Sequence, residues 1–363
     1  MIPEDILKSV PKVELHQHLD GGLRVPTIIE LAEKQNFKLP AEDPKSLKAW
    51  FEEGCNLKSL TLYLKTFNVT TAIMQTEENL TRIAYEVVQD WKKENVVYGE
   101  VRFAPIFHTA EGLSMDRVVE AVLRGLDQGK KETGVEYGLI LCAMRHQSPE
   151  ISLEVAKLAV AFRDRGVVGF DLAGDESGNP PKKHLDAFQY IRKKNFNITL
   201  HAGEAFGLDS IWQAIQVCGA HRIGHGTHLI DDVNHEGLMI ESMGDLAHYV
   251  LDKRIPLEMC LSSNIGTGAA ESFANHPFPL FFRNHFRVFL CTDNPLMSNT
   301  SMTKEMKIAS DTYGLNLKDL ERVTVNAMKS SFLHHDEKLR IIYQVIKKQY
   351  ADIRQAYGYS DWN

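Results

Sequence analysis

Runs of β-branched and apolar residues recur along the chain and alternate with segments of helical character. Eight such runs occupy residues 12–16, 96–103, 135–143, 167–174, 197–203, 222–226, 255–263 and 287–293. Nearly continuous apolar runs of this length are typical of strands that are buried on both faces of a parallel sheet. The pattern therefore predicts eight parallel strands.

Most of the intervening segments have the period of an amphipathic helix. One stripe, with spacings of i, i+3, i+4, i+7, i+8 and i+11, consists of Leu80, Ile83, Ala84, Val87, Val88 and Trp91. Further along, Ser148 and Pro149 fit the N-cap and the first position of another helix. Eightfold alternation of strand and helix predicts an α/β fold, the (β/α)8 TIM barrel.

Two segments exceed what a minimal barrel needs. About 80 residues separate the first two strands, and their spaced apolar residues predict extra helices inserted after strand 1, over the barrel mouth. From Asp336 onward the chain predicts a C-terminal amphipathic helix packed outside the barrel. Without a linker, internal repeat or low-complexity tract, residues 1–363 are interpreted as a single domain.

Composition narrows the functional classes. The 363 residues are 44% hydrophobic and 25% charged, which suits a large folded core. The formal net charge of −7, with no Lys/Arg run longer than three, argues against a protein that reads a nucleic-acid backbone.

Cysteine usage and the N-terminus indicate the compartment. Five scattered cysteines without a C-x-x-C pair favour a reducing compartment: Cys55, Cys142, Cys218, Cys260 and Cys291. The first ten residues are acidic where a signal peptide is basic, and no apolar stretch approaches the roughly 18 residues that span a bilayer. We expect a cytoplasmic protein without a membrane segment.

Residues that can ligate a metal stand at the ends of the predicted strands. His16 and His18 are two apart, so on a strand both imidazoles face the same side. His201 and Asp293 end two other strands, and a barrel collects its strand ends on one face. Two structural histidines could explain the first pair alone, but the four together favour Zn²⁺ or another borderline divalent ion.

Two further positions carry candidate chemistry. Glu204 follows His201 in H-A-G-E, where Gly203 permits a turn that returns the carboxyl to the cavity. The competing interpretation makes Glu204 a helix N-terminal charge. His225 stands between two glycines, which indicates a crowded site. By contrast, residues 170–176 (FDLAGDE) fit an ordinary turn after a strand.

These motifs together resemble the adenosine deaminase family over nearly the whole chain. The segments VELHQHLDG, RIAYEVVQDWKKENVVYGEVRFAP, DLAGDE, LHAGE, RIGHG, EMCLSSN and CTDN follow one another in the order found in that family. The resemblance implies one Zn²⁺ per chain, held by His16, His18, His201 and Asp293, with a water as a further ligand. It also implies a hydroxide that attacks C6 of adenosine, and of 2′-deoxyadenosine, to give inosine and ammonia.

The resemblance also assigns roles. Glu204 is expected to donate a proton to N1 of the purine, and His225 to hold and help deprotonate the attacking water with Asp293 as its second partner. His18 is expected at the substrate as well as the metal, the Gly174 N–H at N3, and Asp20 at the ribose hydroxyls. In the insertion, four residues are expected to cover the ligand: Leu57, Leu60, Leu62 and Phe67.

One position departs from the best-known members of that family. They carry a second Asp after the metal-binding Asp, and this chain has Asn294. An amide donates a hydrogen bond at any pH, so we expect Asn294 to keep the contact with N7. The change bears on how strictly the chain selects adenosine over related aminopurines.

Other functions fit less well. Zinc deaminases with H-x-E and P-C-x-x-C motifs ligate through cysteine, and the chain has no C-x-x-C. A binuclear amidohydrolase typically has a lysine that ends strand four, and an AMP deaminase needs a basic phosphate site; neither is evident. An adenine or aminodeoxyfutalosine deaminase, or a non-catalytic nucleoside-binding barrel, stays open as an alternative.

Overall fold

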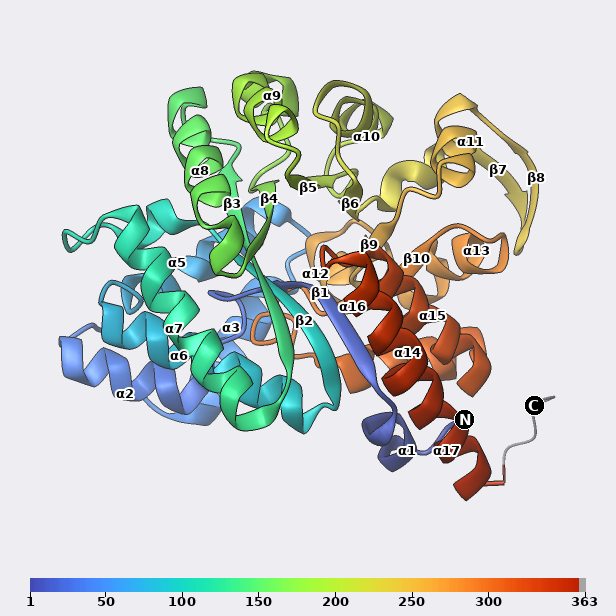
Figure 1. Cartoon of the computed structure of the whole chain (residues 1–363), viewed down its shortest axis with the longest axis horizontal. Helices are drawn as coiled ribbons and strands as arrows, with labels where there is room; N and C mark the ends of the chain where they lie inside the picture. Colours follow the sequence, from blue (N-terminus) through green and yellow to red (C-terminus); the bar gives the residue numbers. More distant parts are fainter. Residues whose placement is uncertain (359–363) are drawn as a thin grey trace.

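Eight parallel strands form the centre of the computed structural model, which describes residues 1–358 (Figure 1). In their order in the sheet, these strands are β1 (Lys12–His18), β2 (Val96–Phe103), β3 (Glu136–Met144), β4 (Val167–Ala173), β5 (Asn197–Ala202), β6 (Arg222–His225), β9 (Leu257–Met259) and β10 (Val288–Leu290). Each predicted apolar run overlaps one of them, and β1 and β3 extend beyond the ends of their runs. Valine, isoleucine, leucine and phenylalanine from all eight contribute to one buried core.

The sheet closes between the first strand and the chain just after the last one. Gln17 and Asp293 form a parallel bridge, in which the Asp293 N–H donates to the His16 carbonyl (2.7 Å) and the His18 N–H donates to the Asp293 carbonyl (2.8 Å). The closed ring confirms the predicted (β/α)8 barrel. It also brings His18 and Asp293, which are 275 positions apart in the sequence, into direct contact.

Helices surround the eight strands of the barrel (Figure 1). Their bounds are α1 (Glu4–Ser9), α2 (Val25–Gln35), α3 (Pro44–Cys55), α4 (Leu60–Tyr63), α5 (Phe67–Ala72), α6 (Glu77–Lys93), α7 (Met115–Thr133), α8 (Pro149–Ala161), α9 (Leu185–Lys193), α10 (Leu208–Trp212), α11 (Asp245–Asp252), α12 (Leu261–Thr267), α13 (Phe278–Arg283), α14 (Met302–Tyr313), α15 (Leu317–Ser330), α16 (His335–Arg340) and α17 (Lys347–Ala356).

Local sequence signals explain two of these helices in detail. Every residue of the predicted stripe on α6 is buried, from Leu80 to Trp91. At the start of α8 the Ser148 hydroxyl accepts the Ile151 N–H, and Pro149 holds the first helical position, where no N–H is needed. Both predictions are confirmed.

Three segments differ from the sequence expectations. The seventh strand ends at Met259, and α12 begins at Leu261, although the apolar run continues to residue 263. The run misleads because α12 is itself buried. A short antiparallel hairpin, β7 (Val233–Glu236) and β8 (Met239–Met243), was not expected. The C-terminal helix is present, but a π-helical segment, Ile341–Ile346, interrupts it.

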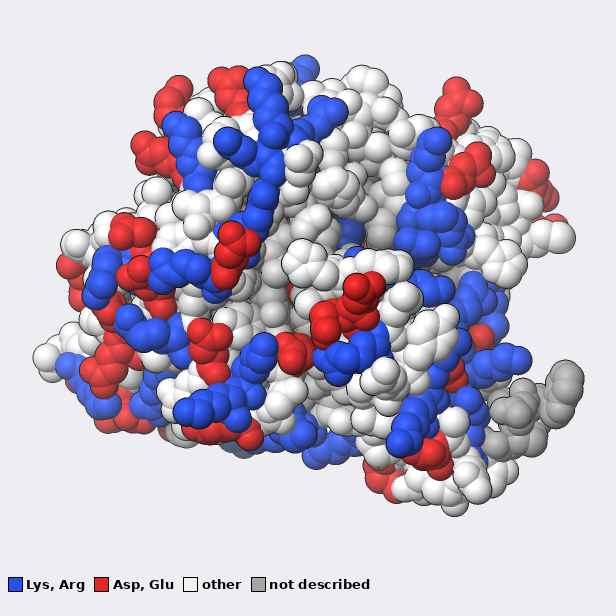
Figure 2. Space-filling view, in the orientation of Figure 1, with Lys and Arg blue, Asp and Glu red and all other residues white. Residues whose placement is uncertain are grey.

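The insertion after β1 supplies α2 to α5, and residues of α4 and α5 line the cavity at the carboxyl ends of the strands. The insertion therefore lies over the barrel mouth, as predicted. Figure 2 shows acidic and basic side chains intermixed over the helices on the visible face. Among the helices in the described part of the chain, none combines the length and apolar character needed to cross a bilayer.

Candidate active site

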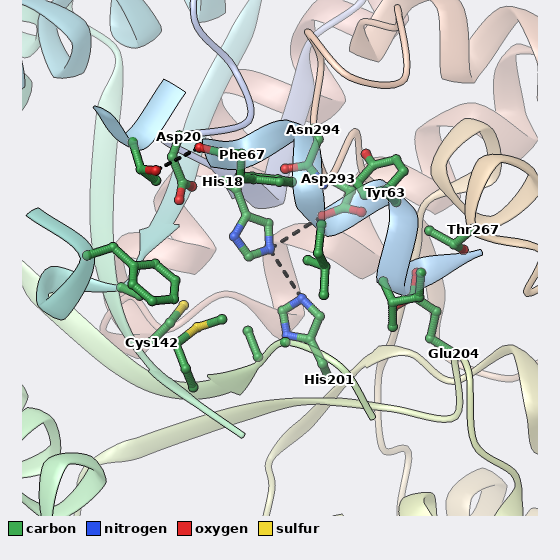
Figure 3. A pocket seen from close by; sticks show the side chains of 18 of the residues that line it. His18, Asp20, Tyr63, Phe67, Cys142, His201, Glu204, Thr267, Asp293 and Asn294 are labelled. Carbon is green, nitrogen blue, oxygen red and sulfur yellow. Dashed lines mark hydrogen bonds and ion pairs between the residues drawn. The ribbon is translucent and has the colours of Figure 1, made fainter. Parts of the chain in front are cut away.

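A cavity of about 320 Å³ opens at the carboxyl ends of the strands, beneath α4 and α5. Its lining contains most of the residues singled out in the sequence: His18, Asp20, Gly174, His201, Glu204, His225, Asp293 and Asn294. His16 is fully buried behind them. In Figure 3, Glu204 and Thr267 lie to one side of His18, His201 and Asp293, and Asp20 and Cys142 lie to the other. The barrel thus brings the predicted metal-ligating, catalytic and substrate-binding residues into one site.

Four side chains present their ligand atoms to a common point. The Nε2 atoms of His16 and His18 lie 3.1 and 3.2 Å from Nε2 of His201. The same two atoms lie 3.3 and 3.4 Å from Oδ1 of Asp293. Adjacent ligands on a tetrahedral ion with bonds of about 2.05 Å are separated by about 3.35 Å, so the four side chains fit a small divalent cation.

Hydrogen bonds to the Nδ1 atoms of two of these imidazoles give further support for a cation at this point. Nδ1 of His16 contacts Oε2 of Glu258 (2.6 Å), and Nδ1 of His201 contacts the Asp171 carboxylate (3.0 Å). Each carboxylate accepts an Nδ1–H, which leaves the opposite Nε2 atom with a bare lone pair. Two lone pairs 3.1 Å apart repel each other unless a cation lies between them. The donor set therefore matches a metal site.

Arginines anchor these supporting carboxylates inside the barrel. Arg102 is fully buried and donates to Asp171 (3.0 Å) and Glu258 (2.8 Å), while Arg222 donates to the other oxygen of Glu258 (2.6 Å). Burial alone would raise the pKa of Glu258, but the two guanidinium groups hold it well below its usual range. The ionised carboxylate fixes the orientation of His16, as supporting residues do in metal sites.

Backbone strain marks two residues of the site. Asp293 (φ 59°) and His225 (φ 61°) lie in the left-handed region, which residues other than glycine seldom occupy. Such conformations cost about 1–3 kcal/mol and persist where the surroundings over-determine them. At Asp293 the bridge to β1 fixes the backbone, while the Ser263 hydroxyl donates to the side chain (2.6 Å).

Glu204 faces the cavity and does not cap a helix. The next helix begins only at Leu208, and Gly203 adopts a φ of 70° that turns the chain after β5. Among the described residues, Oε1 of Glu204 has no hydrogen-bond partner, and Oε2 lies 3.6 Å from Nε2 of His225. Burial raises the pKa of Glu204 and favours its protonated form.

A second carboxylate, Glu176, holds the loop that carries Glu204. Its two oxygens accept four consecutive backbone N–H groups, those of Gly203, Glu204, Ala205 and Phe206, at 2.7–3.0 Å, together with the Ser210 hydroxyl. Glu176 is almost fully buried. The turn at 170–176 is thus more than the ordinary connection that its sequence suggested.

Arg145 stabilises the same loop from the other side. Its guanidinium is buried, donates to the carbonyls of His201 and Asn179, and lies 3.9 Å from Glu176. Because Arg145 belongs to the segment after β3, it links the ends of three neighbouring strands around the loop.

Asn294 and residues of the insertion after β1 complete the lining of the cavity. A side chain at Gly21 would collide with Asn294, since its Cβ would lie 1.8 Å from Oδ1, so glycine is required there. Leu60 and Phe67 line the cavity as expected. Leu57 and Leu62 do not: they are 54% and 38% exposed, because the short helix α4 and the helical turn that follows it direct Leu60, Tyr63 and Leu64 inward instead.

Several residues of the site were not anticipated from the sequence. Thr267, on α12, lines the cavity with a buried hydroxyl that has no partner among the described residues. Asp171, Glu258 and Arg102 could have been found, because each interrupts an otherwise apolar run. A charge inside a buried strand needs a partner, and here the partners are the imidazoles of His16 and His201 and each other.

Comparison with known proteins agrees with this geometry. The sequence model of the family described as adenosine deaminase matches residues 11–348. An adenosine deaminase 1 of Streptomyces coelicolor is 48% identical over 99% of this chain and 90% of its own length. An adenosine deaminase of Mycobacterium leprae is 49% identical over 95% of this chain and 96% of its own. Among solved structures, an Arabidopsis N6-mAMP deaminase superposes with a TM-score of 0.81 at 28% identity, covering 96% of this chain and 99% of that one.

Proposed function

The chain belongs to the adenosine deaminase family, and we propose that the cavity at the barrel mouth is its active site. The chain is a hydrolase that acts on C–N bonds, and its reaction is the hydrolytic deamination of adenosine to inosine and ammonia. The observation that carries the site assignment is the meeting of His16, His18, His201 and Asp293 around one point beside Glu204.

The resident metal of this proposal is a single Zn²⁺ held by those four residues. Three imidazoles and one carboxylate suit zinc, and the separations of their ligand atoms match its bond lengths. When bound, the ion lowers the pKa of a water molecule and so supplies the nucleophile near neutral pH.

Glu204 acts in this proposal as the acid that protonates N1 of the purine. Protonation at N1 makes C6 more electrophilic, and burial raises the pKa of Glu204, which favours the protonated carboxyl that this role needs. Its free oxygen, Oε1, supports the role because a buried polar atom without a partner needs one from the ligand. His225 and Asp293 lie next to Glu204 and flank the point of attack.

Three contacts position the rest of the substrate. The Gly174 N–H is assigned to N3, the Asn294 amide to N7 and Asp20 to the ribose hydroxyls. All three residues line the cavity. Oδ1 of Asp20 is buried without a partner among the described residues, as expected of an atom that serves a ligand.

The charge of the cavity supports a nucleoside as the substrate. Among the described residues that line it, none is lysine or arginine, while Asp20, Glu204 and Asp293 are acidic. A 5′-monophosphate would bring further negative charge without a cation to pair with it. A preference for nucleosides over nucleotides distinguishes this proposal from the activity named for the Arabidopsis neighbour.

We also propose one domain over residues 1–363, acting in the cytoplasm.

A substrate panel tests the function. Adenosine, 2′-deoxyadenosine, adenine, AMP and N6-methyl-AMP are each assayed for loss of the purine amino group by ultraviolet absorbance, with metal analysis of the same sample. The proposal predicts turnover of the two nucleosides, loss of turnover with a chelator and recovery with Zn²⁺. Faster turnover of AMP or of free adenine would contradict the substrate assignment.

A further inference from the structure

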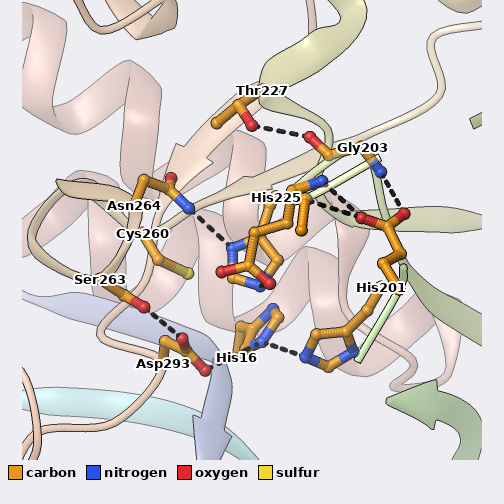
Figure 4. A network of polar contacts seen from close by, with 12 residues as sticks. His16, His201, Gly203, His225, Thr227, Cys260, Ser263, Asn264 and Asp293 are labelled. Atoms are coloured by element: carbon orange, nitrogen blue, oxygen red, sulfur yellow. Dashed lines mark hydrogen bonds and ion pairs between the residues drawn. The ribbon is translucent and has the colours of Figure 1, made fainter. Parts of the chain in front are cut away.

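A line of hydrogen bonds leads from a backbone amide to the imidazole of His225. The Phe278 N–H donates to Nδ1 of His276 (3.0 Å), and Nε2 of His276 lies 3.1 Å from Oδ1 of Asn264. The Nδ2 atom of Asn264 lies 3.0 Å from Nδ1 of His225, the contact drawn in Figure 4. All four residues are buried, so water does not compete for these contacts.

The backbone amide fixes the direction of every bond in this line. An N–H of the main chain can only donate, so Nδ1 of His276 accepts and its proton is on Nε2. Nε2–H then donates to Oδ1 of Asn264, and the amide nitrogen of Asn264 donates to Nδ1 of His225. Nδ1 of His225 is therefore an acceptor. A neutral His225 carries its proton on Nε2.

A rotated amide at Asn264 would break this order. Its nitrogen would then face Nε2–H of His276, and two donors would meet without an acceptor. Burial lowers the pKa of His276 to about 3, so its ring does not take up a second proton near neutral pH. The order of donors and acceptors is therefore unchanged. The other ring nitrogen of His225, Nε2, lies on the side of Glu204, 3.6 Å from its Oε2.

We propose that Asn264 and His276 are positioning residues that keep the proton of neutral His225 on Nε2, so that His225 donates a hydrogen bond to the oxygen that attacks C6. This inference rests on the proposed function. It retains the holding role expected for His225 and transfers the expected role as a base to Asp293, the other expected partner of the attacking water, because a nitrogen that already carries a proton cannot accept another. Neither Asn264 nor His276 was assigned a function from the sequence.

The direct test is the tautomer of His225 in the metal-loaded protein. Histidine is labelled with ¹⁵N, long-range proton–nitrogen spectra are recorded, and the signals of His225 are identified by their loss in His225→Gln. The proposal predicts a protonated Nε2 and an unprotonated Nδ1. The opposite pattern overturns it. Because no substrate is present, this result is independent of whether adenosine is deaminated.

Kinetics of Asn264→Asp test the consequence. A carboxylate only accepts, so it draws the proton of His225 to Nδ1 and leaves Nε2 bare. A hydrogen bond to a developing negative charge is lost, which corresponds to a fall in kcat of about 10- to 100-fold with little change in KM. Asn195→Asp is the control, since it adds the same charge at an exposed position that precedes β5, at the end of the barrel away from the cavity.

Each outcome of these experiments either supports or overturns the proposal. A lower kcat in Asn264→Asp with unchanged metal content, together with a proton moved to Nδ1, supports the proposal. Activity equal to that of Asn195→Asp overturns it. If Asn264→Asp does not fold, the spectrum of the wild type decides alone. A wild type that releases no ammonia from adenosine refutes the proposed function, while the tautomer is still measured.

Discussion

Replacing Glu176 with glutamine should loosen the loop that carries Glu204. The carboxylate accepts one backbone N–H and the Ser210 hydroxyl on Oε1, and three backbone N–H groups on Oε2. An amide has one acceptor oxygen, so its NH₂ group must face the donors of one side. The less costly orientation keeps the three N–H groups on oxygen and leaves the Gly203 N–H without an acceptor.

The cost follows from these contacts. One buried donor left unpaired costs about 1–3 kcal/mol, and three bonds that lose their charge-assisted character cost roughly 0.5–1 kcal/mol each. The total is about 2.5–6 kcal/mol. For 363 residues at roughly 2.1 cal/mol/K each, the entropy of unfolding is about 0.76 kcal/mol/K, so Tm should fall by about 3–8 °C.

Activity should fall further than stability explains. A shift of about 1 Å in a catalytic group can cost about 100-fold in rate, so kcat/KM of Glu176→Gln is expected to drop by 10- to 100-fold. The control is Asp232→Asn, which removes a carboxylate that accepts the Ala247 N–H far from the cavity (2.8 Å). That variant should lower Tm and leave kcat/KM unchanged.

A double-mutant cycle decides whether Glu176 acts through Glu204. If it does, Glu176→Gln costs far less in a protein that already carries Glu204→Gln, because the group that it positions is absent. Equal costs in both backgrounds, or a lower Tm with unaltered kcat/KM, would refute the reasoning.

Three further results are expected. Since burial raises the pKa of Glu204 and only its protonated form can donate to N1, kcat/KM should fall as pH rises through that raised pKa; a pH profile of Glu204→Gln that keeps this alkaline limb would contradict the role. Glu258→Gln should weaken zinc binding by about 10- to 100-fold in chelator competition, because His16 loses its orienting carboxylate, and unaltered affinity would show that Glu258 does not support the site. Asn294→Asp should keep the metal and alter kcat/KM; loss of the metal would mean that the roles of Asp293 and Asn294 were divided wrongly.

The sequence was sufficient to predict the barrel and the meeting of His16, His18, His201 and Asp293, because both depend on simple regularities. Buried parallel strands need continuous apolar runs, and eight runs placed all eight strands. The fold then fixes where those strands end, so His16, His201 and Asp293 could be brought together without coordinates. Exact strand ends escaped prediction where a buried helix continues an apolar run, as at Leu261.

Glu176 and Asn264 were missed because the groups that they contact cannot be deduced from the order of residues in the sequence. Glu176 contacts backbone amides, which no motif records, and Asn264 depends on the orientation of His276. The insertion was located correctly, but Leu62 was assigned to the cavity wrongly. Which face of α4 turns inward is decided by its packing, and four helical residues are too few to reveal a stripe.

The most direct test of the account is the position of a metal in the purified protein. Diffraction data collected on both sides of the zinc absorption edge should give one anomalous peak per chain, about 2.0–2.2 Å from Nε2 of His16, His18 and His201 and from a carboxylate oxygen of Asp293. A protein that deaminates adenosine at full rate with no peak at that point, or with two peaks in the cavity, would contradict a single ion shared by these four side chains.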